Sequence, residues 1–563
     1  MSIKSVVIGV CLVLGGVVCY AQQTPTWSQF VATSSAATAD ARWRAVTLPQ
    51  PRILMAGQLL NANLNALGLA AGGRGSWTGS AFTGHWSAGT CNPRAAYGAG
   101  TACTWNNSGG AQHFIGAAYA AGVRVLDVNM DPEVLSAAAE YNPQGLASAS
   151  YASGGTGCTN GTQNVTFAAN GGVVGTVTVA GHVPTGSVTL SHPGYGFSGA
   201  TATGQVASCT GTTTFNITLD SSKVIASDCP GGATYSYGQT PPATTGNGGN
   251  NWACATLYNY DLMFAYAVNT YGIKLHLRVK PDSVTTVVQW TAGTTEQQFI
   301  DQYAPVVVAA VKRWGGLIDS ETLIHEAIGG FQSNIPFNFT TTWISDYITN
   351  AAASIRTFNS TVHLGACADT PFPGDAAYMT MYLAHPSLDY VCVDLYGRGC
   401  TMATYGAQVL SVAQAWAQTA LANGKTIRLE EAGSPPHMPL TCSHPDDTDA
   451  YEGSGWTGYS TSGIHDQWLE TITPLMSAWG MTGMTVFCDE WMIWATSSPS
   501  NSNCVQFTPV SGAPPWLAMT ATQLASSPNE AGVLYGRLGA WPAGGPASLQ
   551  GNAHLTGKAR IGN

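Results

Sequence analysis

Apolar runs of strand length alternate with helix-like segments along most of this 563-residue chain. Such alternation is typical of βαβ units that build a parallel sheet. The expected strands are residues 52–61, 122–129, 273–279, 322–326, 362–366, 390–396, 427–431 and 484–488. Helices are expected between them, for example over residues 299–314, 343–358, 405–422 and 467–479.

Eight such units in one domain predict a closed (β/α)₈ barrel, also called a TIM barrel. In this fold the carboxyl ends of the strands and the loops after them carry the active site. An open, doubly wound sheet is the competing architecture. It usually carries a glycine-rich GxGxxG phosphate turn after its first strand, and that turn is absent here.

Residues 147–251 break the pattern. They are rich in Gly, Thr, Ser and Val, and they read as short alternating strands separated by glycine turns. We expect a small all-β module inserted between the second and third barrel strands, with residues 22–146 and 252–563 forming the barrel and a C-terminal tail. The module resembles glycine-rich β-repeats of phage and bacterial surface proteins. A glycan-holding role and a purely structural role are both open.

The first 21 residues read as a secretion signal. Lys4 supplies the positive charge, residues 6–18 form the apolar segment, and cleavage is expected before Gln22. Acylation of Cys19, as in a lipoprotein, is the alternative. No later stretch approaches the roughly 20 apolar residues of a membrane-spanning helix. The chain is therefore expected to be secreted, either extracellular or periplasmic.

Cysteine usage agrees with export. Fourteen cysteines occur, two of them within the signal, and the remaining even number is compatible with complete pairing in an oxidising compartment. Connectivity does not follow from sequence. Local bridges are conceivable between close neighbours, such as Cys91 with Cys103, Cys392 with Cys400, and Cys488 with Cys504.

Composition limits the partners. Only 9% of residues are charged and the net charge is −10, so the basic surface that nucleic acid requires is missing. The 17 Trp and 22 Tyr provide flat faces that stack on sugars, although most of them are expected to fill the core. CxxC and HExxH motifs are absent, so neither a metal nor a cofactor is expected. A calcium ion in the acidic loop 444–449 is a minor alternative, and the oligomeric state is not fixed by the sequence.

Hydrolysis of a glycosidic bond usually requires two carboxyl groups, one to protonate the leaving oxygen and one to attack the sugar or activate water. Glu326 ends the fourth expected strand in TLIHEAIGG. Glu430 and Glu431 end the seventh in TIRLEEAGSPP. Because side chains alternate along a strand, only one of the adjacent pair is expected to enter the barrel, and Glu431 is preferred. Asp489 and Glu490 are the rival carboxylates.

These motifs resemble clan A of the retaining glycoside hydrolases, whose acid/base and nucleophile glutamates end the fourth and seventh strands. Most members carry Asn-Glu on the fourth strand, whereas His325-Glu326 resembles the β-mannanase type, glycoside hydrolase family 26. Glu431-Ala432-Gly433 matches the Glu-x-Gly pattern of the seventh strand. The resemblance implies that Glu431 is the nucleophile and Glu326 the acid/base, with no cofactor.

The resemblance also assigns binding residues. Tyr396 occupies the position of a tyrosine that hydrogen-bonds the nucleophile, and Trp491 that of a tryptophan under the cleaved sugar. His276 and Arg278 alternate on one face of the third strand, so either is expected to reach the sugar or to keep Glu431 ionised. Packing within the barrel is the alternative for both, and the same holds for Asp127 and Asn129.

The sequence thus predicts a secreted enzyme that hydrolyses β-glycosidic bonds in a polysaccharide or oligosaccharide, with mannan or glucan first among the substrates. Retention requires the two carboxyls to lie about 5 to 5.5 Å apart, and inversion about 6.5 to 9.5 Å. A non-catalytic glycan-binding or cell-surface protein is the alternative from another class. A serine hydrolase is less favoured because no GxSxG turn follows any expected strand.

Overall fold

The computed structural model describes a subset of the chain. The described residues are 54–59, 125–130, 132–223, 237, 252–279, 288, 290–327, 335–368, 376–396, 402–433, 479, 481 and 483–486. The expected secretion signal, the acidic loop 444–449 and Trp491 lie outside this part of the chain, and so do Asp489 and Glu490.

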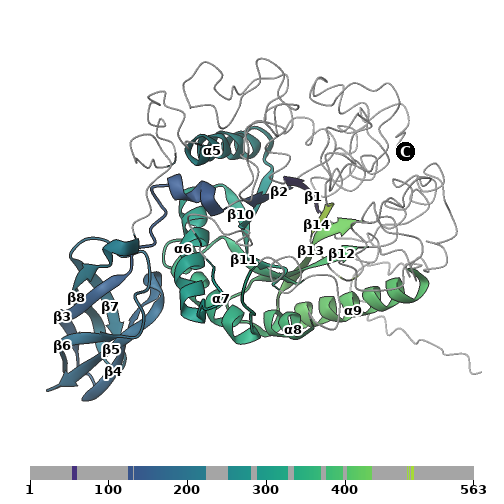
Figure 1. The fold of residues 1–563 in the computed structure, drawn as a ribbon. Coiled ribbons are helices and arrows are strands. Elements are labelled where there is room, and N and C mark those ends of the chain that lie inside the picture. Colours follow the sequence, from purple (N-terminus) through teal and green to yellow (C-terminus); the bar gives the residue numbers. More distant parts are fainter. Residues whose placement is uncertain are drawn as a thin grey trace, which may run out of the picture.

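Eight parallel strands form the central sheet, which closes on itself in the order β1-β14-β13-β12-β11-β10-β9-β2 (Figure 1). They are β1 (Leu54–Leu59), β2 (Val125–Met130), β9 (Lys274–Val279), β10 (Ile318–His325), β11 (His363–Ala368), β12 (Tyr390–Tyr396), β13 (Thr426–Gly433) and β14 (Gly483–Val486). Every expected barrel strand overlaps one of these. The parallel sheet that the alternating pattern predicted is therefore present.

Five long helices are described around this sheet: α5 (Trp252–Tyr271), α6 (Glu296–Trp314), α7 (Thr341–Arg356), α8 (Ala376–Ala384) and α9 (Met402–Ala422). The last four join consecutive strands from β9 to β13, as right-handed βαβ units require. Segments after β1, β13 and β14 fall outside the described residues, so the complete eightfold repeat stays a prediction. None of the described helices is both long and apolar enough to cross a membrane.

Helix α6 begins three residues earlier than its apolar pattern indicated. The hydroxyl of Thr295 accepts a hydrogen bond from the backbone N–H of Gln298, and the Gln298 side chain accepts one from the N–H of Thr295. This reciprocal capping box satisfies two of the free donors at a helix start. Polar capping residues therefore set the boundary, while the apolar residues begin only at Phe299.

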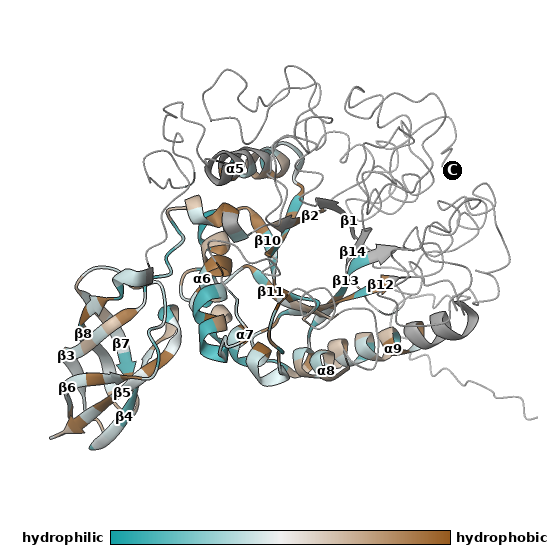
Figure 2. Cartoon of the chain, in the orientation of Figure 1, coloured by the Kyte–Doolittle hydropathy of each residue, from teal (hydrophilic) through white to brown (hydrophobic). Residues whose placement is uncertain are grey.

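The predicted all-β module lies between β2 and β9 as a second, antiparallel barrel in the order β3-β6-β5-β4-β7-β8. Its strands are β3 (Leu146–Thr156), β4 (Gly161–Phe167), β5 (Gly172–Ala180), β6 (Val183–Leu190), β7 (Thr201–Val206) and β8 (Thr210–Leu219). Hydrophobic and hydrophilic positions alternate along them (Figure 2). Phe167, Phe197 and Phe215 meet edge to face in the module's core, and a Cys158–Cys209 disulfide adds a covalent link.

The module rests on helices α6 and α7 (Figure 1). The Tyr195 hydroxyl lies 2.5 Å from Asn350 Oδ1 and 2.7 Å from Ser354 Oγ, both on α7. His192 Nδ1 lies 3.6 Å from a carboxylate oxygen of Asp301 on α6. These contacts attach the module to the helix layer that surrounds the strands.

A buried carboxyl group lies outside the ring of strands. Ser320 and Thr322 contact side chains inside the barrel, so by alternation Glu321 faces helices α6 and α7. It is 0% exposed, and neither of its oxygens has a hydrogen-bond partner among the described residues. Burial and the nearby charge of Glu430 raise the pKa of Glu321 well above its usual range.

Replacing this carboxyl is expected to stabilise the protein, and more so at higher pH. Because the folded-state pKa of Glu321 is raised, the wild type loses up to about 1.4 kcal/mol of stability per pH unit between the unfolded-state pKa of about 4.3 and that raised value. Glu321→Met removes that loss. Urea unfolding at pH 4.5 and pH 7 should show a stability difference between variant and wild type that grows with pH. A difference that is the same at both pH values would contradict the expectation.

Candidate functional site

Glu326 directly follows β10, at the carboxyl edge of the sheet. Its backbone adopts a φ of 48°, in the left-handed region that non-glycine residues rarely occupy. Its N–H donates to the carbonyl of Cys367 on β11 at 3.2 Å. Such a conformation costs roughly 1 to 3 kcal/mol and clusters at functional sites. The side chain is 14% exposed, more than that of any other carboxylate described at this edge of the barrel.

Both glutamates at the end of β13 reach the interior of the barrel. Arg278 on β9 lies 3.0 Å from Glu431 Oε1 and 3.5 Å from Glu430 Oε1. The expectation that only one of them enters the barrel was wrong. The register of β13 against β14 shifts between Leu429 and Ala432, and such an irregularity interrupts the regular alternation of side chains.

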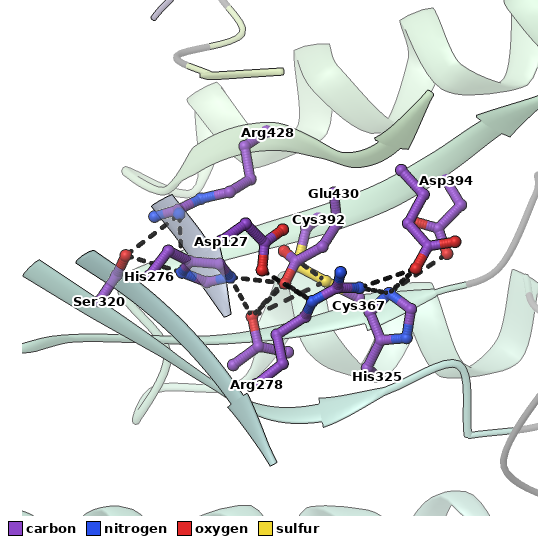
Figure 3. A network of polar contacts seen from close by, with 12 residues as sticks. Asp127, His276, Arg278, Ser320, His325, Cys367, Cys392, Asp394, Arg428 and Glu430 are labelled. Carbon is purple, nitrogen blue, oxygen red and sulfur yellow. Dashed lines mark hydrogen bonds and ion pairs between the residues drawn. A yellow bond between two sulfur atoms is a disulfide. The ribbon is translucent and has the colours of Figure 1, made fainter. Parts of the chain in front are cut away.

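Arg278 is the centre of a network of polar contacts (Figure 3). Its Nε donates to Asp127 on β2 at 2.9 Å and its Nη1 to Glu431 at 3.0 Å. The guanidinium is 0% exposed. Burial lowers the pKa of Arg278, but the charges of Asp127, Glu431 and Glu430 more than offset this and raise it well above its usual range. The positive charge favours the ionised form of Glu431.

Glu430 is fixed on the other side of this network and is 0% exposed. Its Oε1 lies 2.6 Å from His276 Nε2 and accepts a hydrogen bond from Thr322 at 2.8 Å. Burial raises the pKa of Glu430, but His276 and the two arginines Arg278 and Arg428 outweigh it and lower the pKa to about 2. These contacts therefore favour Glu430 as an enclosed negative charge.

His276 holds this charge in place. Its Nδ1 lies 2.8 Å from Ser320 Oγ and 3.0 Å from Arg428 Nη1, and the residue is only 1% exposed. The structure thus gives His276 contacts within the barrel, which was one of the two roles considered for it. A contact between His276 and the sugar stays a prediction.

His325, the last residue of β10, lies between the two candidate catalytic glutamates. Its Nδ1 is 3.7 Å from Glu326 Oε2, and its Nε2 is 3.9 Å from Glu431 Oε1. Since one imidazole ring approaches both carboxylates, Glu326 and Glu431 belong to a single site. The sequence suggested this pair by its strand-end positions and by the resemblance to clan A, and the catalytic roles of the two residues stay a prediction.

Asp394 on β12 is a member of the site that the sequence reasoning missed. It is 0% exposed, and its Oδ2 lies 3.4 Å from His325 Nε2. A search for every acidic residue near the end of an expected strand would have found it in DYVCVDLYG. Tyr396 ends the same strand and pairs with Gly433 on β13, but its side chain lies outside the described residues.

One cysteine pairing differs from the expected neighbours. Cys392 is bridged to Cys367, directly opposite it on β11, rather than to Cys400. The two Cα atoms are 4.3 Å apart, and the Cys367 sulfur lies 2.9 Å from Glu430 Oε2. Strand register places these cysteines together, and sequence distance gave no sign of it.

Three sets of side chains bring potential metal ligands within 4.8 Å of one another. They are Asp127, His276 and Glu430; His325, Cys367 and Glu430; and His325, Glu326 and Asp394. Arg278 contacts a member of each set, at 2.9 Å for Asp127 and 2.7 Å for His325. Its positive charge beside each set opposes the approach of a second cation, so we assign no metal ion to these residues.

No protein-family model matches the chain, and no curated protein matches its sequence. Solved structures that overlap with it include a family 5 glycoside hydrolase from Bifidobacterium longum in complex with Manβ1-4GlcNAc (TM-score 0.34, 13% identity, 52% of this chain and 66% of that one). An endo-β-1,4-mannanase from Cellulomonas fimi overlaps with a TM-score of 0.30 at 14% identity, over 46% and 56% of the two chains.

A glucosidase from Croceicoccus marinus overlaps with a TM-score of 0.27 at 12% identity, over 40% of this chain and 45% of that one. The chain therefore spans less than half of the glucosidase and no more than two thirds of the other two proteins. All three are glycoside hydrolases. Overlaps at these TM-scores do not decide the fold or the activity of this chain.

Proposed function

We propose that this protein is a secreted glycoside hydrolase on a (β/α)₈ barrel, which cleaves β-glycosidic bonds in a polysaccharide or oligosaccharide with retention of configuration. The observation that carries the proposal is the convergence of Glu326 and Glu431 on the ring of His325, at 3.7 and 3.9 Å. Two carboxyl groups in one site are what glycosidic hydrolysis requires.

The two glutamates occupy different environments, as the two roles demand. Glu431 is 4% exposed and bound by Arg278 at 3.0 Å, a contact that favours its ionised form and suits it to attack the anomeric carbon. Glu326 is more exposed, at 14%, and lies at the carboxyl edge of the sheet, 3.7 Å from His325 Nδ1. It is suited to hold a proton for the leaving oxygen.

In this mechanism Glu326 donates its proton to the glycosidic oxygen while a Glu431 carboxylate oxygen bonds to the anomeric carbon and the glycosidic C–O bond breaks. Glu326, now ionised, takes a proton from water, whose oxygen attacks the same carbon and releases Glu431. Each cycle consumes one water and forms one new reducing end and one new non-reducing end. The left-handed backbone of Glu326 sets the direction from which its carboxyl approaches.

The test is the release of reducing ends from soluble β-glucans, mannans, xylans and galactans by the purified protein, with Glu326→Ala and Glu431→Gln in parallel. Activity on one polysaccharide that both substitutions abolish would support the proposal and name the substrate class. Activity that survives both substitutions would show that Glu326 and Glu431 are not the catalytic pair. A folded protein that binds one of the glycans without cleaving it would point to the non-catalytic alternative.

A further inference from the structure

We infer that His325 is a positioning residue held in one neutral tautomer, with Nε2 accepting a hydrogen bond from Arg278 and the Nδ1 proton facing the carboxyl group of Glu326. The role toward Glu326 rests on the proposed function. The tautomer itself rests only on the contacts of the imidazole ring (Figure 3).

The contact with Arg278 fixes which nitrogen carries the proton. Arg278 Nη1 lies 2.7 Å from His325 Nε2. A guanidinium has only donors and stays protonated, so Nε2 must present its lone pair. A proton on Nε2 would place two N–H groups against each other at that distance. The one proton of the neutral ring is therefore on Nδ1.

Arg278 has little freedom to turn away from the histidine. Its Nε is bound to Asp127, and the same Nη1 is bound to Glu431. Both arginine and histidine are buried, at 0% and 5% exposure. The geometry of the donor is thus set by carboxylates on two other strands, and His325 must adapt to it.

Five charged or titratable groups among the described residues lie around the ring. Arg278 comes from β9, Glu326 follows β10, Asp394 comes from β12, and Glu430 and Glu431 come from β13, with a Glu430 carboxylate oxygen within 4.8 Å of a ring nitrogen. The carboxylates of Asp394 and Glu431 lie 3.4 and 3.9 Å from Nε2 and, together with that of Glu430, would favour an imidazolium. The Arg278 guanidinium is nearer to Nε2 and opposes protonation of the ring. Its positive charge repels an imidazolium, and its N–H needs the lone pair of Nε2 as acceptor. The ring consequently stays uncharged.

A neutral ring suits the acid/base role of its neighbour. An imidazolium 3.7 Å from Glu326 would favour the ionised carboxylate and weaken it as a proton donor. A neutral Nδ1–H orients the same carboxyl without adding a charge. The gap of 3.7 Å exceeds hydrogen-bond length, and we expect the partly exposed Glu326 side chain to close it by rotation when substrate binds.

Nuclear magnetic resonance of ¹⁵N,¹³C-histidine-labelled full-length protein tests the tautomer directly, with His325→Asn identifying the signal. We expect the Nδ1–H tautomer and no protonation of His325 between pH 8 and pH 5. In urea the same chain should titrate near the ordinary histidine value of about 6.5. A protonated His325 at pH 6, or an Nε2–H tautomer, would overturn the inference whether or not the protein proves to be a glycosidase.

Kinetics on the identified substrate test the positioning role. Asparagine can place its amide N–H where Nδ1 lies and so keeps a donor toward Glu326, although its oxygen does not reach the position of Nε2. His325→Asn should therefore retain kcat within about 10-fold, whereas His325→Phe should lose about 10²-fold through misplacement of the carboxyl. The alkaline limb of the kcat/KM profile should move to higher pH in the phenylalanine variant and stay in place in the asparagine variant. If both variants lose kcat equally and the alkaline limb of kcat/KM moves in neither, His325 has only a structural role.

Discussion

Glu431→Ala is expected to lower kcat by about 10³-fold or more, and added azide should restore product formation with inverted configuration at the anomeric carbon. The alanine leaves room on the face that the carboxylate occupied. A small anion can attack from there, while Glu326 still protonates the leaving oxygen. The product from a β-linked aryl glycoside would be the α-glycosyl azide, which chromatography and proton coupling constants identify.

Glu430 provides the matched control, since it neighbours Glu431 on the same strand but is enclosed at 0% exposure. Glu430→Ala should lose activity through disorder of Arg278 and His276, and azide should not rescue it. Azide rescue of Glu430→Ala, with none for Glu431→Ala, would exchange the roles of the two residues. A wild type that releases the product of inverted configuration would exclude the retaining mechanism altogether.

The order of the sheet could be predicted because each buried parallel strand is a short, nearly continuous apolar run. The run TLIHE and the run TIRLEE also place their glutamates at the carboxyl ends, where a parallel barrel collects functional groups. The position of the all-β module followed from the change to alternating Thr, Val and Gly. Each of these signals lies within one short segment of the sequence, and that segment forms the predicted element in the folded chain.

The inside of the barrel was less predictable because it depends on register. A register shift between β13 and β14 beside Glu430 and Glu431 brings both carboxylates inward. No residue in TIRLEEAG predicts that shift. The Cys367–Cys392 bridge requires β11 and β12 to lie side by side in one alignment. The link from Asp394 to His325 likewise joins strands distant in sequence. Each of these three features depends on how the strands pair, and the residues near each position in the sequence do not reveal that pairing.

Arg278→Met should destabilise the protein by about 3 to 5 kcal/mol at pH 7, because it leaves buried carboxylates without their counter-charge. Asp127, Glu430 and Glu431 all lie within 3.5 Å of the guanidinium. Arg356→Met is the control. Arg356 forms an ion pair with Asp389 at the surface, with side chains 31% and 42% exposed, and exposed pairs contribute at most about 1 kcal/mol.

The dependence of this loss on pH distinguishes a charge effect from a packing effect. In the wild type the pKa of Glu430 is lowered to about 2, so its stabilising contribution is present above the unfolded pKa of about 4.3 and is lost as the pH falls toward 2. In Arg278→Met the buried carboxylates instead prefer their protonated form, and the variant should gain stability as the pH falls from 7 toward 4.5. Thermal unfolding at both pH values should therefore show the gap between the two proteins narrowing in acid. A gap that stays constant would mean that Arg278 stabilises the barrel by its packing, and that Glu431 does not depend on it for its charge.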